Sequence, residues 1–156
     1  MEFQGKWIRP KADLGDICPV FRKEWKKEGE TEKAELLITA VGVYEARLNG
    51  VRVGDYVLAP GWTSYRTRLQ YQVYDITELL KEDNCLEITV GKGWARSPMP
   101  GFVENEEKRQ RQAQSCGVFA ELYLTDSRGN RTVIGTDGSW QYAESPVRFS
   151  EIYDGE

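Results

Sequence analysis

The chain contains no histidine among its 156 residues. This absence excludes the Ser-His-Asp and Cys-His nucleophile systems, which need an imidazole as general base. It also excludes most zinc sites and other metal sites built on imidazole ligands. Any active site would therefore have to use carboxylate or lysine chemistry, and the remaining alternative is a chain with no complete catalytic apparatus of its own.

Cysteine and long apolar runs are also scarce. Cys18, Cys85 and Cys116 are odd in number and far apart, whereas a disulfide framework favours an even number and a metal site favours closely spaced ligands. We therefore expect free, mostly buried thiols in a reducing compartment. No run approaches the roughly 18 apolar residues of a membrane helix, so we expect no membrane contact. Since no signal peptide is visible at the N-terminus, we expect a cytoplasmic location.

The balance of charge is close to even. The net charge is −4, from 21 basic and 25 acidic residues, which argues against a nucleic-acid partner because such proteins usually carry a basic excess. The longest charged run, Phe21 to Glu35, mixes both signs and predicts a solvated loop or linker. The length and the 40% hydrophobic content predict one domain over residues 1–156. Its closing segment, Ser150 to Glu156, resembles a strand cut at its end, which indicates a fragment of a longer multidomain protein.

Short extended segments separated by turns make up most of the chain. Apolar runs and alternating patterns predict strands at 34–41, 43–48, 51–53, 69–74, 86–90, 118–125 and 131–135. Asn49-Gly50 predicts a type I′ hairpin turn, and Gly42 predicts a bend. A capped helical turn is expected over 75–80, with Asp75 as its N-cap, and a long loop from Trp94 to Cys116. The pattern predicts an all-β fold, a jelly-roll-like antiparallel β-sandwich with one short helix.

Acidic residues at turns are the obvious candidates for carboxylate chemistry. Asp55, Asp75 and Asp137 lie at strand ends or turns, where aspartate usually bonds nearby backbone N–H groups. The segment from Asp126 to Asn130 has a cation in its middle and lacks the acidic residues that would follow in a calcium loop, so it predicts a hairpin turn. A glycosidase needs two carboxylates about 5 to 10 Å apart, and 25 acidic residues would give such pairs by chance. Such a pair is therefore unspecific, and a self-contained carboxylate-pair hydrolase is kept only as an alternative.

Aromatic residues are the more informative candidates. Trp62 and Trp94 lie in or beside loops, close in sequence to Tyr65, Arg96 and Asp55. Aromatic faces pack against the apolar C–H faces of sugars and are also enriched in protein contacts. This set therefore predicts either a carbohydrate platform or a surface that docks on another domain.

A structural role is the competing interpretation for each tryptophan. In that interpretation Trp7 and Trp140 fill the core. Trp62 would then anchor its own loop, and the chain would have no binding surface built on aromatic rings. Exposure of the individual rings separates these alternatives.

Six segments carry a family likeness, in the same order along the chain. They are AVGVYEARLNGVRVGD (40–55), LAPGWTSY (58–65), QYQVYDIT (70–77), GKGW (91–94), TDGSW (136–140) and IYDGE (152–156). Together they resemble the N-terminal module of bacterial α-L-rhamnosidases of glycoside hydrolase family 78. The resemblance covers nearly the whole chain.

This resemblance implies a β-sandwich placed before an (α/α) barrel domain that holds the catalytic carboxylates. The parent enzyme would hydrolyse terminal α-L-rhamnose from glycosides, and the module would assist substrate recognition or pack on the barrel. The expected partners are thus the catalytic barrel of the same parent chain and L-rhamnose or rhamnosides, and no catalytic residue is carried over to this chain. A purely structural interdomain spacer is the alternative. We expect no cofactor; calcium is the alternative, because some β-sandwich modules of the family bind rhamnose with calcium, although no ligand motif here supports it.

Overall fold

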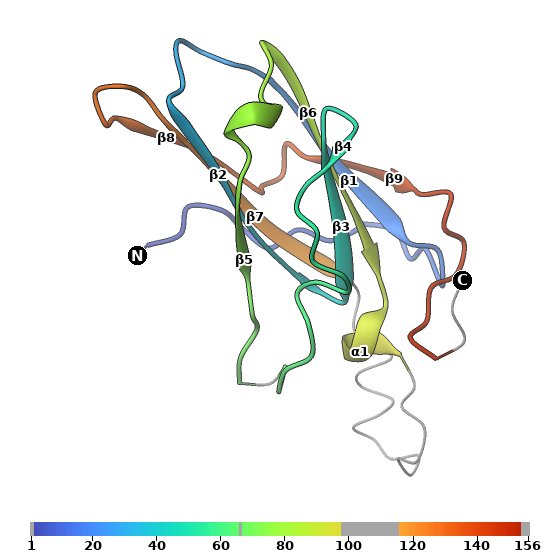
Figure 1. The fold of residues 1–156 in the computed structure, drawn as a ribbon. Helices are drawn as coiled ribbons and strands as arrows, with labels where there is room; N and C mark the ends of the chain where they lie inside the picture. Colours follow the sequence, from blue (N-terminus) through green and yellow to red (C-terminus); the bar gives the residue numbers. More distant parts are fainter. Residues whose placement is uncertain (1, 66, 98–115, 154–156) are drawn as a thin grey trace.

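Two facing antiparallel sheets form the structure, a computed structural model that describes residues 2–65, 67–97 and 116–153 (Figure 1). The elements are β1 Pro19–Lys26, β2 Lys33–Val41, β3 Val43–Leu48, β4 Val51–Arg52, β5 Gln72–Asp75, the 3-10 helix η1 Thr77–Leu79, β6 Asp83–Gly91, α1 Gly93–Arg96, β7 Gly117–Thr125, β8 Arg131–Gly135 and β9 Gln141–Glu144. One sheet has the strand order β4-β3-β6-β1-β9 and the other β5-β2-β7-β8. The predicted all-β sandwich is confirmed.

The core lies between the two sheets and is built from alternate residues of their central strands. Its fully buried members include Leu36 and Ile38 of β2, Leu86 and Ile88 of β6, and Leu122 of β7. Burying each such side chain contributes about 1.5–3 kcal/mol. The core therefore fixes the positions of the loops at both ends of the sandwich.

A sharp bend at Gly42 carries the chain from one sheet to the other. Gly42 has a φ of 131°, and a Cβ atom there would lie 2.1 Å from the carbonyl oxygen of Gly91. Gly93 has a φ of 54°, and a Cβ atom there would lie 2.7 Å from Cγ1 of Val43. The bend predicted at Gly42 is confirmed, and the close approach of β6 to it places α1 beside the start of β3.

The charged run Phe21 to Glu35 is not a solvated loop, so that prediction is wrong. Its first part belongs to β1, which pairs with β6 on one side and with β9 on the other. Phe21 is 1% exposed, and Trp25 packs against the core. The apolar side chains recur at every second or fourth position, and the charged residues between them obscured this strand pattern.

The turns agree more closely with the predictions from the sequence than the charged run does. Asn49 and Gly50 have φ angles of 54° and 83°, which confirms the type I′ turn. The predicted helical turn is the 3-10 helix η1, and its N-cap position is Ile76 rather than Asp75, which ends β5. The Oδ1 atom of Asp75 instead accepts hydrogen bonds from the backbone N–H and the hydroxyl of Thr77, at 3.0 and 2.6 Å. The predicted strand at 69–74 begins only at Gln72.

The predicted loop between Trp94 and Cys116 begins with a short helix, α1, which the sequence did not indicate. The rest of that loop, residues 98–115, lies outside the described residues. No disulfide links the three cysteines, all of which lie in the described part of the chain. Within the described ranges no helix has the length and apolar character needed to cross a bilayer.

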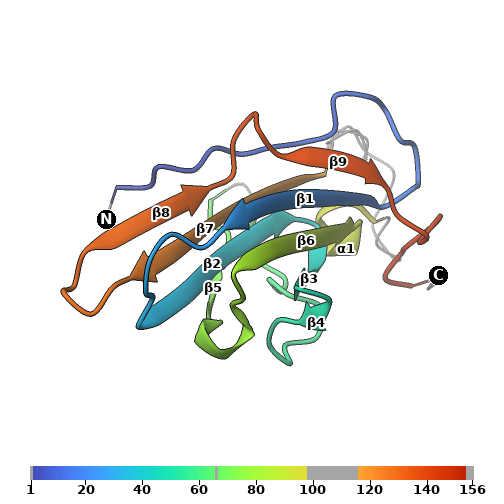
Figure 2. The same ribbon diagram turned by 90° about the horizontal axis from the view of Figure 1, so that it is seen from above.

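The N-terminal segment runs along the sandwich past β8 towards β9 (Figure 2). Ile8 forms an isolated bridge with Val118 of β7. Closer to the terminus, the N–H groups of Gln4 and Gly5 donate to Oε1 of the buried Glu121, at 2.5 and 2.6 Å. A carboxylate on β7 therefore holds this segment against the sheet.

Candidate functional site

Trp62 and Trp94 form a parallel stack. Their ring centroids lie 6.3 Å apart and their planes differ by 9°. Trp62 is 56% exposed, and Trp94 is partly exposed. The structure thus brings two of the predicted site residues into one surface feature, although they come from different parts of the chain.

The segment before Trp62 is tied firmly to the sandwich. The backbone N–H of Tyr44 in β3 donates to the carbonyl of Ala59 at 2.8 Å. The side-chain amide of Gln72 in β5 donates to the carbonyl of Pro60 at 3.2 Å. Since strands of both sheets hold this segment, Trp62 projects from a fixed point rather than from a loose loop tip.

The short helix α1 sets the position of Trp94. Its close contact with the bend at Gly42 fixes its start at Gly93, and the N–H of Ser97 donates to the Gly93 carbonyl at 3.0 Å. Ala95 is 2% exposed and faces the core, so the residues on either side of it, Trp94 and Arg96, project from other faces of the helical turn.

The remaining predicted site residues do not all join the stacked pair. The hydroxyl of Tyr65 donates to the carbonyl of Gly61 at 3.3 Å, and partial burial raises the pKa of this hydroxyl, which keeps it protonated. Burial raises the pKa of the Cys116 thiol, and the nearby positive charge of Arg96 partly offsets this rise. Arg96 therefore lies near Cys116. Asp55 is exposed and has no hydrogen bond or salt bridge within the described ranges. Tyr65 is therefore a loop anchor, and no hydrogen bond among the described residues ties Asp55 to the stacked pair.

Large apolar side chains are exposed in the same loop. Tyr56, Val57 and Leu58 precede the segment that holds Trp62, and all three are more than 40% exposed. Exposed apolar residues that are gathered in one stretch, rather than scattered singly, mark contact sites. We call Tyr56, Val57, Leu58, Trp62 and Trp94 the aromatic loop surface.

The other tryptophans divide between the core and the surface. Trp140 is 8% exposed, and its Nε1 donates to the carbonyl of Gly135 at 3.1 Å, which confirms its predicted core position. Trp7 is 49% exposed and packs beside Phe119 with ring centroids 5.9 Å apart. The prediction that Trp7 fills the core is wrong, because it covers the outer face of β7 instead.

The aspartates at turns form turns, as their sequence positions predict. A nearby side chain donates a hydrogen bond that lowers the pKa of each: Thr77 for Asp75, Asn130 for Asp126 and Ser139 for Asp137. A general acid needs a pKa raised towards neutrality, so these carboxylates suit turn formation. In the described part of the chain, no three cysteine or acidic side chains gather as metal ligands.

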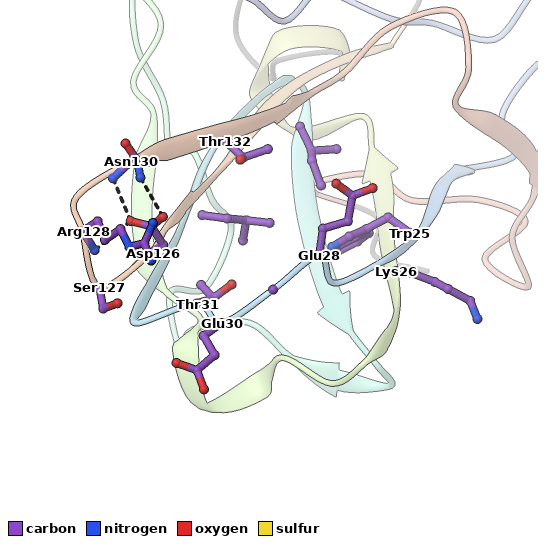
Figure 3. A pocket seen from close by; sticks show the side chains of 13 residues that line it. Trp25, Lys26, Glu28, Glu30, Thr31, Asp126, Ser127, Arg128, Asn130 and Thr132 are labelled. Atoms are coloured by element: carbon purple, nitrogen blue, oxygen red, sulfur yellow. Dashed lines mark hydrogen bonds between the residues drawn. The ribbon is translucent and has the colours of Figure 1, made fainter.

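Four hollows lined by described residues contain neither Trp62 nor Trp94. Two of them contain Trp25, a residue that the sequence pattern placed in a solvated loop, and Figure 3 shows one of these two. The alternation of Phe21, Lys23 and Trp25 was the signal that could have revealed its inward orientation.

The family model and the curated relatives that match this chain all point to one family. The family model described as "Alpha-L-rhamnosidase N-terminal domain" matches residues 29–156. An α-L-rhamnosidase of Streptomyces avermitilis is 36% identical over 97% of this chain and 14% of its own length. One of Formosa agariphila is 33% identical over 86% of this chain and 14% of its own.

Solved structures agree with this family. The α-L-rhamnosidase of Aspergillus terreus superposes with a TM-score of 0.86 at 37% identity, over 98% of this chain and 18% of that one. The Streptomyces avermitilis enzyme, solved with L-rhamnose, gives 0.80 at 32% identity, over 90% of this chain and 13% of that one. The chain spans only 14–18% of the length of the curated relatives it matches. It belongs to the α-L-rhamnosidase N-terminal domain family.

Proposed function

We propose that this chain serves as the accessory N-terminal module of an α-L-rhamnosidase and that its aromatic loop surface packs on the catalytic domain of the same parent chain. The exposed Trp62, stacked on Trp94 and preceded in its loop by other exposed apolar side chains, is the observation that carries this proposal. The relatives named as α-L-rhamnosidases are several times longer than this chain. Most of such a parent chain, including its catalytic carboxylates, would therefore lie outside this module.

A docking role fits the aromatic loop surface better than a sugar platform does. A small-molecule site needs a concave shape and a few convergent polar groups. The hydroxyl of Tyr65 already donates to Gly61, and Asp55 forms no hydrogen bond or salt bridge with a described residue that would aim it at the stacked rings. Val57 and Leu58, which precede Trp62 in the same loop, offer no polar atoms beyond their backbone, whereas exposed tryptophan is enriched in protein interfaces.

The test uses the full parent protein with Trp62 and Trp94 both replaced by alanine. We expect the module to unfold separately from the catalytic domain, so that one calorimetric transition becomes two, and we expect a lower rate on an aryl α-L-rhamnoside. Trp7→Ala is the matched control, because Trp7 has similar exposure but lies on Phe119. A single unshifted transition in the double variant would disprove docking through this surface.

Two measurements on the isolated module test the alternatives. Titration calorimetry with L-rhamnose, with and without calcium, should show no heat that depends on Trp62; heat abolished by Trp62→Ala would assign sugar binding to this surface. Turnover of an aryl rhamnoside that persists through purification would instead support a self-contained carboxylate-pair hydrolase. Neither result is expected from a docking module.

A further inference from the structure

The outer face of the sheet β5-β2-β7-β8 carries a second hydrophobic cluster, on the side that points away from the core. Leu37 of β2 and Phe119 and Tyr123 of β7 form this cluster, and Val133 of β8 packs against it. These residues alternate with the core residues of the same strands. The outer face of an antiparallel sheet is commonly solvated and polar, so a hydrophobic cluster there marks a face suited to contact with protein.

Three large side chains border this cluster and remain about half exposed. Phe3, from the N-terminal segment, packs edge-on against Phe119, with ring centroids 5.4 Å apart. Val73 of β5 lies beside the cluster in the pairing with β2, and Tyr71, two residues earlier in the extended chain, shares its face. Trp7 also touches Phe119 but lines a hollow towards β9. We call Phe3, Tyr71 and Val73 the outer sheet patch.

The outer face of the other sheet has the opposite character. Charged side chains of β1 and β3 pair with one another there, as Arg22 does with Glu24 at 2.5 Å and Arg47 with Glu45 at 2.8 Å. Such a face is compatible with water. Because both faces belong to one sandwich, the fold itself does not require the outer sheet patch to be apolar, and exposed apolar residues that lie together mark contact sites.

Charges at one end of the β5-β2-β7-β8 face are divided between its two edges. Asp75 of β5 lies beside Glu35 of β2 in the strand register, and Lys33 pairs with Glu35 at 2.8 Å, which leaves Asp75 to make the β5 edge acidic. On the opposite edge strand, β8, the guanidinium of Arg131 lies 4.7 Å from the centroid of the Tyr123 ring and forms no salt bridge with a described residue. Since Tyr123 pairs with Glu35, the acidic and basic edges lie at the same end of the sheet.

The N-terminal segment raises one side of this face. The N–H groups of Gln4 and Gly5 donate to the Glu121 carboxylate of β7, and a Cβ atom at Gly135 of β8 would lie 2.7 Å from the Cα atom of Gly5. The segment therefore lies over β7 and β8, while Val73 on the β5 side stays exposed. The face is thus higher on its basic side than on its acidic side.

This arrangement is complementary to itself. A two-fold axis that lies in the interface, parallel to the strands, places β5 of one copy over β8 of the other. Asp75 of each copy then faces Arg131 of the other copy, and Phe3 on the raised side faces Tyr71 and Val73 on the lower side. Two sheets pack face to face in this way in sandwiches, and a symmetric dimer uses the same surface on both subunits.

We propose that this chain forms a symmetric dimer through the outer face of its β5-β2-β7-β8 sheet. Strands β2 and β7 have nine residues each, so a four-stranded face of this length covers roughly 19 by 30 Å. Such a face is near the lower limit of a standard interface, which buries about 800 Å² on each partner. We therefore expect a dissociation constant in the micromolar range. The aromatic loop surface is not part of this contact, so the dimer does not depend on its docking role.

Sedimentation equilibrium of the 156-residue chain from micromolar to millimolar concentrations tests the dimer. We expect the mean mass to rise with concentration from 17.9 kDa towards twice that value. Val73→Lys places a charge without a partner in the contact, so it should weaken association by about 10-fold or more. Val51→Lys is the matched control, because Val51 has almost the same exposure but lies on β4, the edge strand of the other sheet. It should leave the association unchanged.

A charge exchange tests the orientation of the two copies. Arg131→Glu and Asp75→Lys each create two repulsive contacts in the symmetric dimer, so either variant alone should associate about 5-fold more weakly. An equimolar mixture of the two variants restores opposite charges at both contacts. The mixture should therefore associate as tightly as the unaltered chain, which a general loss of folding in either variant would not allow.

Three results would overturn the proposal. A mass of 17.9 kDa at every concentration would mean that the outer sheet patch is covered by another domain of the parent chain or by none. Association weakened by Trp62→Ala but not by Val73→Lys would place the contact on the aromatic loop surface instead. A mixture that associates no better than its two variants would rule out the two-fold arrangement.

Discussion

Trp62 and Trp94 lie with their ring planes only 9° apart and their centroids 6.3 Å apart, although Trp62 lies in the loop between β4 and β5 and Trp94 is the second residue of α1. This separation corresponds to an offset stack, and Trp62 remains 56% exposed and so available to a partner. The docking role proposed for this surface requires that the two rings behave as one preorganised unit. This requirement leads to a measurement on the isolated chain.

A double-mutant cycle with Trp62→Ala and Trp94→Ala should show a coupling free energy of about 0.5–1.5 kcal/mol, the value of an aromatic pair beyond its burial. Urea unfolding of the two single variants and the double variant gives this energy. The pair Trp62→Ala with Trp140→Phe is the control and should add without coupling, because Trp140 is in the core. Additive effects in the first cycle would show that the rings are adjacent but independent.

The bend at Gly42 should tolerate no side chain. Its φ of 131° and the 2.1 Å approach of a Cβ atom to the Gly91 carbonyl oxygen add backbone strain to a steric clash with main chain. Gly42→Ala should therefore lower the free energy of unfolding by about 3 kcal/mol, measured by urea denaturation. Gly138→Ala is the matched control, since a Cβ atom there meets nothing within 4 Å, and it should change stability little.

Local signals explain why the hairpin of β3 and β4 could be predicted. Asn49 and Gly50 adopt the positive φ angles that their residue types favour, and this preference acts within two residues. The bend at Gly42 was predictable for the same reason. The strand β1 was not, because its pattern depends on which face of a sheet Phe21 and Trp25 occupy, and charged residues on the other face obscured that pattern.

The candidate site was predictable only as a set of residue types. Sequence proximity grouped Asp55 and Tyr65 with Trp62. In the structure the Tyr65 hydroxyl instead donates to the Gly61 carbonyl, and Asp55 has no hydrogen-bond or salt-bridge partner in the described part of the chain. The stack on Trp94 depends on the packing of α1 against the bend, a long-range relationship. The outer sheet patch brings the N-terminal segment and β5 onto one face, a long-range combination that no local pattern contains.

The carboxylate of Glu121 should anchor the N-terminal segment. It is 1% exposed and accepts the N–H groups of Gln4 and Gly5 as well as the hydroxyl of Tyr123. Glu121→Ala leaves these donors without an acceptor, so we expect a loss of about 3 kcal/mol and faster hydrogen exchange at the Ile8 amide. Exchange at Ile8 that stays as slow as in the unaltered chain would show that the bridge to Val118 alone holds the segment.

A matched control for this anchor is Glu78→Ala. Glu78 is an exposed residue of η1 with no hydrogen bond or salt bridge to any described residue. Its removal should change the free energy of unfolding by less than about 0.5 kcal/mol. Equal losses at the two sites would indicate an effect of net charge rather than of the buried hydrogen bonds.

Acid should destabilise the fold through its turn aspartates. Hydrogen bonds from Thr77, Asn130 and Ser139 lower the pKa values of Asp75, Asp126 and Asp137 in the folded chain. The unfolded chain therefore binds protons first as the pH falls below about 4, and the stabilisation, complete above that pH, is lost as the pH falls through the lowered folded values. Carboxyl ¹³C titration of the folded chain should give values below about 3.9 for these residues.

Asp126→Asn isolates one of these contributions. An asparagine oxygen can still accept the N–H groups of Arg128 and Asn130, which Asp126 now binds at 2.8 Å each, but it does not titrate. The variant should fold normally and lose less stability than the unaltered chain between about pH 5 and about pH 2, as measured by urea unfolding at each pH. If both proteins lose stability in parallel, the acid sensitivity arises elsewhere, and the hydrogen bonds at this turn do not depend on the charge of Asp126.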